Sequence, residues 1–137
     1  MAAKLNPYIS YNGNAREAFE FYKEVFGGEL AMNTFGEFGA SDSSDADKIM
    51  HASLETPSGF TLMGADTPAE LEYKPGTTMS VSLSGDDGDD LRGYYEKLAE
   101  AGTVTMPLEK QMWGDEFGMV IDQFGVSWMV NIAAPQG

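Results

Sequence analysis

The chain repeats itself, and this internal duplication limits the folds available to it more than any other feature. Residues 8–13 (YISYNG) are echoed 72 positions later by residues 80–85 (SVSLSG). Residues 59–63 (GFTLM) are echoed 66 positions later by residues 125–129 (GVSWM). Such spacing is typical of a supersecondary unit of about 60 residues that occurs twice. The sequence therefore predicts two similar modules.

The boundaries of these modules follow from the same comparison. Module one is expected over about residues 4–66 and module two over about residues 78–132, with a proline-containing linker at residues 67–77. The chain has 137 residues, of which 42% are hydrophobic, so it can bury about two-thirds of its unfolded surface. We therefore expect one domain, over residues 1–137, made of two halves.

Hydrophobic periodicity assigns the same order of elements to each half. In the first half, Ile9 and Tyr11 mark a strand, and an apolar stripe from Ala15 to Phe26 marks a helix with Asn14 as its N-cap. In the second half, Val81 and Leu83 mark a strand, followed by a helix that Gly102 ends. Three further strands are expected after each helix, at residues 29–35, 50–55 and 60–65 and at residues 103–108, 117–121 and 126–132. Each module is predicted to be βαβββ.

The charge of the chain limits its partners. Twenty-two acidic and eight basic residues give a net charge of −14, which disfavours nucleic acid and anionic membrane surfaces because basic side chains bind both. The absence of cysteine excludes disulfides and thiolate chemistry, and no apolar run reaches the ~20 residues of a membrane span. We expect a soluble, cytoplasmic protein.

Two acidic segments resemble binding sites but have simpler explanations. Asp42, Asp45 and Asp47 lack the glycine and the glutamate that a calcium loop needs in register, so a solvated loop is predicted. The acidic residues at 86–90 stand where negative charge stabilises the start of a helix, so we interpret them as a cap.

Several motifs resemble the PhnB-like family of the vicinal oxygen chelate superfamily, which contains glyoxalases, bleomycin-resistance proteins, fosfomycin-resistance enzymes and extradiol dioxygenases. They are residues 7–10 (PYIS), 18–22 (AFEFY), 26–29 (FGGE), 51–52 (HA), 111–114 (QMWG), 117–118 (FG) and 122–128 (DQFGVSW). Members of this family often have a demethylubiquinone methyltransferase label. The glycine-rich turn of a typical methyl-donor site is absent from this sequence.

The resemblance implies an α+β fold in which two βαβββ modules form one cupped, eight-stranded mixed sheet. It also implies a ligand in the concave interior and a homodimer. Strand alternation then predicts which side chains face the cup. Trp113 is expected either beside the cup, as a lid or a stacking surface for a flat ligand, or in a subunit or module interface. The predicted ligand-binding residues are Tyr8, Ser10, His51, Ser53, Met63, Thr78, Ser80, Trp113, Met129 and Asn131, whereas Trp128 is predicted to lie in the core.

The usual metal ligands of the superfamily map by resemblance onto Asn6 (or Pro7), Met63, Thr78 and Met129. Thioethers, hydroxyls and amides bind the divalent metals of such enzymes poorly. No metal or other cofactor is therefore predicted.

Two hypotheses remain open for the function. The first is a binding protein that holds a small organic molecule in the cup without the usual metal, as bleomycin-resistance proteins do. The second is a lyase, isomerase or dioxygenase-type enzyme in which His51, the single histidine, acts as acid–base catalyst. Glu109 or Glu116 would orient His51 or supply a second acid. In a variant of the second, His51 and Glu55 join a loop carboxylate as ligands of a displaced metal.

Overall fold

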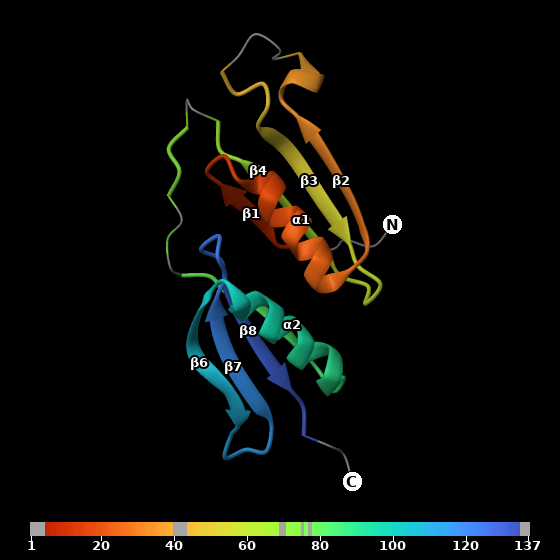
Figure 1. The fold of residues 1–137 in the computed structure, drawn as a ribbon, viewed down its shortest axis with the longest axis vertical. Helices are drawn as coiled ribbons and strands as arrows, with labels where there is room; N and C mark the ends of the chain where they lie inside the picture. Colours follow the sequence, from red (N-terminus) through yellow and green to blue (C-terminus); the bar gives the residue numbers. More distant parts are fainter. Residues whose placement is uncertain (1–4, 40–43, 69–70, 75, 77, 135–137) are drawn as a thin grey trace. The chain divides into compact units, whose positions relative to one another are not determined.

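The chain divides into two compact units, Met1–Pro75 (unit 1) and Gly76–Gly137 (unit 2). A computed structural model of the protein describes residues 5–39, 44–68, 71–74, 76 and 78–134, which Figure 1 draws in colour. The boundary between the units falls inside the predicted linker. The prediction that both units act as a single domain stays a prediction.

Unit 1 is a four-stranded mixed sheet with one helix. Its elements are β1 (Tyr8–Tyr11), α1 (Ala15–Phe26), β2 (Glu29–Thr34), the 3-10 helix η1 (Gly36–Phe38), β3 (Ile49–Glu55) and β4 (Thr61–Asp66). The strand order is β1-β4-β3-β2. The first strand, β1, runs parallel to β4, whereas the other neighbouring strands are antiparallel.

Unit 2 repeats this arrangement, and the predicted α+β fold with two βαβββ modules is confirmed. Its elements are β5 (Val81–Gly85), α2 (Gly88–Glu100), β6 (Thr103–Lys110), β7 (Glu116–Ile121) and β8 (Ser127–Ile132). The strand order is β5-β8-β7-β6, and β5 runs parallel to β8. The eight strands of the described residues thus lie in two four-stranded sheets. The closing of both sheets into one cup stays a prediction.

The core of unit 1 lies between α1 and the sheet. The predicted apolar stripe of α1 is buried, with Phe19 and Tyr22 fully enclosed, and the Tyr11 hydroxyl donates a hydrogen bond of 2.9 Å to the Tyr22 hydroxyl. Phe19 packs on Gly64 of β4, where an added Cβ would lie 2.8 Å from the ring. The helix can approach the sheet this closely because Gly64 has no side chain.

The predicted N-cap position of α1 is confirmed, but the capping hydrogen bond comes from another residue. Asn14 stands at the N-cap position but makes no capping hydrogen bond. Instead Asp66, at the end of β4 and 4% exposed, accepts hydrogen bonds from the Ala15 and Ile49 amides, both at 2.9 Å. One buried carboxylate therefore caps α1 and also fixes the start of β3.

In unit 2, the predicted burial of Trp128 and the predicted acidic cap of α2 are confirmed. Trp128 is fully buried, and the side chain of Asp87 accepts a hydrogen bond from the Asp90 amide at 3.3 Å. The strand β6 extends to Lys110, two residues beyond its predicted end.

Among the described residues, no helix has the length and apolarity to span a membrane.

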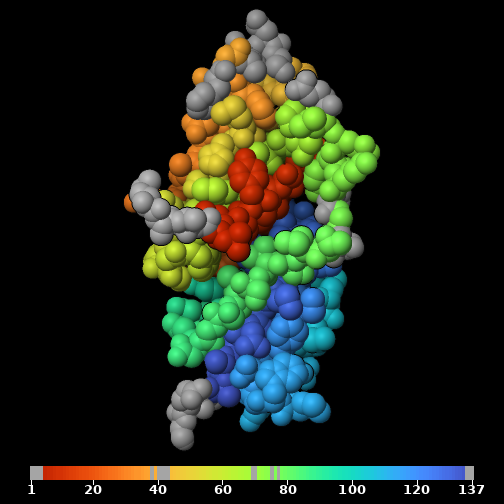
Figure 2. All heavy atoms as spheres, turned by 180° about the vertical axis from the view of Figure 1, so that it is seen from behind, coloured from red at the N-terminus to blue at the C-terminus, as the bar shows by residue number. Residues whose placement is uncertain are grey.

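Each sheet has one face that the helix of its unit does not cover. In β4 and β8 the buried side chains alternate with half-buried ones, as expected when one face packs on a helix. In Figure 2, β1 of unit 1 lies in red at the surface on the side away from α1. In unit 2, β7 and β8 lie in blue at the surface on the side away from α2. We call these the open face of unit 1 and the open face of unit 2.

Candidate functional site

The open face of unit 1 holds five of the predicted ligand-binding residues. Ala52 and Leu54 of β3 are buried on the side of α1, so the alternate residues His51 and Ser53 lie on the open face. Pairing across the sheet then places the remaining three on the same face, because residues opposite one another share a side. These three are Tyr8, Ser10 and Met63.

Tyr8 and His51 come together on this face from two strands that are not neighbours. The Tyr8 hydroxyl lies 3.4 Å from Nδ1 of His51, and the ring centroids are 5.8 Å apart. Tyr8 is 55% exposed, and its partner in the register is Met63 of β4. A phenol, an imidazole and a thioether thus border one accessible surface, which offers both polar and apolar contacts to a bound molecule.

Asn33 is a neighbour of this pair and was not predicted as a site residue. It lies directly opposite His51 in the β2–β3 ladder, and its amide nitrogen donates a hydrogen bond of 3.1 Å to Glu37. Glu37 is itself held by a hydrogen bond of 3.2 Å from its backbone N–H to the Thr34 hydroxyl. The polar edge of the open face is therefore braced from η1.

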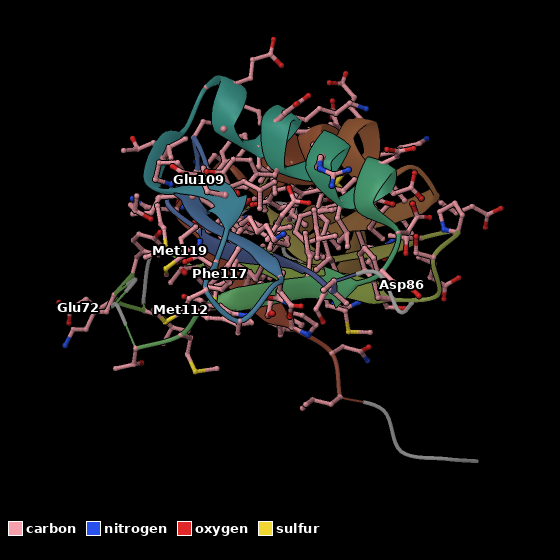
Figure 3. All side chains as sticks on the ribbon, turned by 90° about the horizontal axis from the view of Figure 1, so that it is seen from below. Glu72, Asp86, Glu109, Met112, Phe117 and Met119 are labelled. Atoms are coloured by element: carbon pink, nitrogen blue, oxygen red, sulfur yellow. The ribbon has the colours of Figure 1, made fainter. Side chains whose placement is uncertain are left out.

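The open face of unit 2 has a different composition. Met129 and Asn131 of β8 lie on it as predicted, opposite Met119 and Phe117 of β7. Their neighbours Trp128 and Val130 are fully buried on the side of α2. Figure 3 labels Phe117 and Met119 on β7, with α2 on the other side of the sheet. Phe117 and Met119 were not predicted as site residues, although the 66-residue repeat relates them to His51 and Ser53.

The predicted residues Ser80 and Thr78 precede β5 and are exposed. The Ser80 hydroxyl lies 2.9 Å from the hydroxyl of Ser127, so this residue is attached to the edge of the open face of unit 2. Trp113 lies in the turn between β6 and β7 and is 60% exposed. The structure therefore places Ser80 at the sheet and Trp113 at the tip of a hairpin.

Asn131 is oriented by Asp115. Its amide nitrogen donates a hydrogen bond of 3.0 Å to one oxygen of Asp115, and the Ala134 amide donates one of 2.8 Å to the other. These hydrogen bonds, with that of Asn131 as the largest effect, hold the pKa of Asp115 below its usual range. Asn131 is thus fixed in place by a carboxylate that remains charged.

The two acids predicted to assist His51, Glu109 and Glu116, belong to unit 2, whereas His51 belongs to unit 1, so their role beside His51 stays a prediction. Glu116 is engaged by Arg92 of α2 in unit 2, and Glu109 lies opposite Phe117 in the β6–β7 ladder. Within the described part of the chain, no group of three histidine, cysteine, aspartate or glutamate side chains is placed to hold a metal ion. Asp42 of the acidic loop lies outside the described residues.

The donor set at the four positions of the superfamily's usual metal ligands does not fit a divalent metal. Met63 and Met129 supply thioethers, and Asn6 and Thr78 supply an amide and a hydroxyl. Divalent metals in such enzymes prefer imidazole and carboxylate donors. No step of a reaction is therefore assigned to a metal at these positions.

An open hollow of about 540 Å3 lies elsewhere in unit 2. It is lined by Lys110, Gly114, Glu116, Ile132, Ala133 and Ala134. None of these is a predicted ligand-binding residue, and the carboxylate of Glu116, one of the two candidate acids, is paired with Arg92. We therefore look for a candidate site on the open face of each unit separately, where the predicted residues gather.

Known proteins are similar to this chain in sequence over nearly its whole length. The chain is 28% identical to protein YjdN of Escherichia coli over 96% of its own length and 97% of that protein. It is 32% identical to the uncharacterized protein Rv0887c of Mycobacterium tuberculosis, with 96% of this chain and 77% of that one covered.

Solved structures are similar to this one over nearly the whole chain. Protein PA1353 from Pseudomonas aeruginosa is 40% identical, with a TM-score of 0.87 over 98% of this chain and 100% of that one. A PhnB protein from Bacillus cereus is 25% identical, with a TM-score of 0.75 over 96% and 100%. The resemblance to the PhnB-like family is thereby confirmed. Since residues 4–130 also match the family model described as "Glyoxalase/Bleomycin resistance protein/Dioxygenase superfamily", the chain belongs to that superfamily.

Proposed function

We propose that the protein binds a small, partly apolar organic molecule on the open face of unit 1, without the metal usual in its superfamily. The contact between Tyr8 and His51 beside Met63 carries this proposal, because it offers hydrogen-bonding groups and an adaptable apolar surface at one accessible place. The thioethers at two of the usual ligand positions further support binding without a divalent metal.

The proposed role of His51 and Tyr8 is to fix the orientation of the bound molecule. An imidazole and a phenol can each donate or accept a hydrogen bond, whereas Met63 and the Tyr8 ring supply dispersion contacts. Asn33 adds an amide whose nitrogen is already held by Glu37. This combination suits a molecule with one polar edge and one apolar face.

A fragment library screened by amide NMR spectroscopy on uniformly 15N-labelled protein tests the proposal. Hits are expected to shift the amide signals of β1, β3 and β4. His51→Ala is expected to weaken the best hit about three- to tenfold, the loss typical of one hydrogen bond. Lys23→Ala, on the helix that covers the other side of the sheet, is the matched control and should leave the affinity unchanged. Hits that shift only signals of unit 2 would contradict the proposed location.

The Tyr8–His51 contact also favours a second candidate, an acid–base enzyme in which His51 transfers the proton. In that case His51→Ala lowers turnover by about 10²–10⁴, a loss far larger than that of one binding contact. Tyr8→Phe separates the roles of the two residues, because it keeps the ring and removes the hydroxyl. Incubation of the screening hits with the protein, followed by mass spectrometry for products, decides between binding alone and catalysis.

A further inference from the structure

Three methionines stand side by side across three neighbouring strands of unit 2. Met106 of β6 is the register partner of Met119 of β7, and Met119 is in turn the partner of Met129 of β8. Register partners point to the same face of a sheet, so the three thioethers lie in one row on the open face of unit 2. We call these three residues the methionine row.

The irregular backbone of β6 is what brings Met106 into this row. Val104 pairs with Val120, which is buried on the side of α2, so a regular ladder would pair Met106 with Gly118 on that same side. A register shift between Val104 and Met106 instead places Met106 opposite Met119. A second shift follows between Met106 and Glu109. Such bulges re-aim side chains and occur often beside functional sites.

The row is accessible from solvent within its unit. Met106 is 40% exposed, and Met119 and Met129 are half-buried. Neighbouring strands lie about 4.8 Å apart, and a methionine side chain is unbranched with three rotatable bonds. The two outer sulfurs can therefore swing toward the sulfur of Met119 and converge on one point above β7, whose open side is seen in Figure 3.

We infer that the methionine row is a binding site for a soft monovalent cation of the Cu(I) type. Thioether sulfur is a poor ligand for hard and borderline divalent ions but a good one for Cu(I). The row holds three such donors and no carboxylate between them, which selects against magnesium, calcium and zinc. The net charge of −14 raises the local concentration of cations around the protein. This site is in unit 2 and does not depend on the function proposed for unit 1.

Silver(I) is the probe for this site, because it shares the preference of Cu(I) for thioethers and is stable in air. The protein contains nine methionines, whose methyl groups are labelled with 13C and assigned by single substitutions to leucine. One equivalent of silver nitrate is added to the protein in chloride-free buffer. The methyl signals of Met106, Met119 and Met129 are expected to shift together, and the other methionine signals should remain in place. One equivalent of zinc should shift none of them.

Matched variants test the same site by isothermal titration calorimetry with silver(I). M106L/M119L/M129L is expected to bind at least about tenfold more weakly than the wild type, since leucine keeps the volume but not the sulfur. M63L, in unit 1, should bind as the wild type does. If circular dichroism shows that the triple variant is unfolded, the single variant M119L replaces it in the titration, because Met119 lies between the other two methionines. Unchanged affinity in the variant that folds, or shifts confined to Met63, Met79 or Met112, would overturn the inference.

Discussion

The indole Nε1 of Trp128 donates a hydrogen bond of 2.9 Å to Oδ2 of Asp122 in the buried part of unit 2. The other oxygen, Oδ1, accepts hydrogen bonds from the amides of Phe124 and Val126 at 2.9 and 3.0 Å. Asp122 therefore joins the largest core side chain of the unit to the turn between β7 and β8.

Asp122→Ala is expected to lower the free energy of unfolding by about 1–3 kcal/mol, because it leaves the buried indole N–H without its acceptor. The neighbouring Gln123 is exposed, so Gln123→Ala should change stability by no more than about 0.5 kcal/mol. Urea unfolding followed by tryptophan fluorescence measures both variants. Equal stability of the two variants would mean that the hydrogen bond contributes nothing.

Two glycines are expected to respond in opposite directions to replacement by alanine. At Gly64 an added Cβ would lie 2.6 Å from the carbonyl oxygen of Ile9 and 2.8 Å from the Phe19 ring, whereas at Gly93 of α2 it meets nothing within 4 Å. Gly64→Ala should destabilise unit 1 by about 1–3 kcal/mol through overpacking. Gly93→Ala should stabilise α2 by about 0.5–1 kcal/mol, because alanine loses less backbone entropy in a helix.

Urea midpoints of the two glycine variants, measured beside the wild type, check both signs. A Gly64→Ala variant as stable as the wild type would show that α1 can move away from β4 without cost.

Acid should remove one specific stabilising contribution from unit 2. Arg92 donates hydrogen bonds to both oxygens of Glu116, and these hold the pKa of Glu116 below its ordinary value of 4.5. A lowered pKa stabilises the fold at pH values above 4.5, and this contribution is lost as the pH falls through the lowered pKa. Glu116→Gln should thus be less stable than the wild type at neutral pH, with a difference that shrinks in acid.

A double-mutant cycle with Arg92→Ala isolates this contribution from those of other carboxylates. The coupling between the two residues should be measurable by urea unfolding at neutral pH and vanish in acid. A coupling that is the same at both pH values would show that the charge on Glu116 is not its source.

The duplicated pattern predicted the order of the elements well. The spacing of buried apolar residues differs between a strand and a helix, and this spacing can be read from each segment by itself. The alternation in β8 correctly separated Trp128 from Met129 and Asn131. The alternation could not reveal the bulges of β6. At a bulge, the face on which a side chain lies is set by the pairing with β7, and the sequence of β6 alone does not show this pairing. For the same reason Met106 was not predicted as a neighbour of Met119.

Long-range contacts explain the other failures. Local rules assigned the cap of α1 to Asn14, the residue before the helix, whereas the carboxylate that accepts from Ala15 belongs to Asp66, 51 residues along the chain. Asn33 was missed because its partner His51 follows it only after the loop that contains η1. The 66-residue repeat did contain the signal for Phe117 and Met119, through their correspondence to His51 and Ser53.

The parallel pairing of the first and last strands of each unit has a consequence for synthesis on the ribosome. Tyr8 of β1 pairs with Met63 of β4, and Val81 of β5 pairs with Trp128 of β8. In each half, the earliest strand to be translated therefore has no partner until the latest has left the exit tunnel. A ribosome stalled before residue 66 would hold a nascent chain whose first helix lacks its capping carboxylate and whose first strand lacks its neighbour.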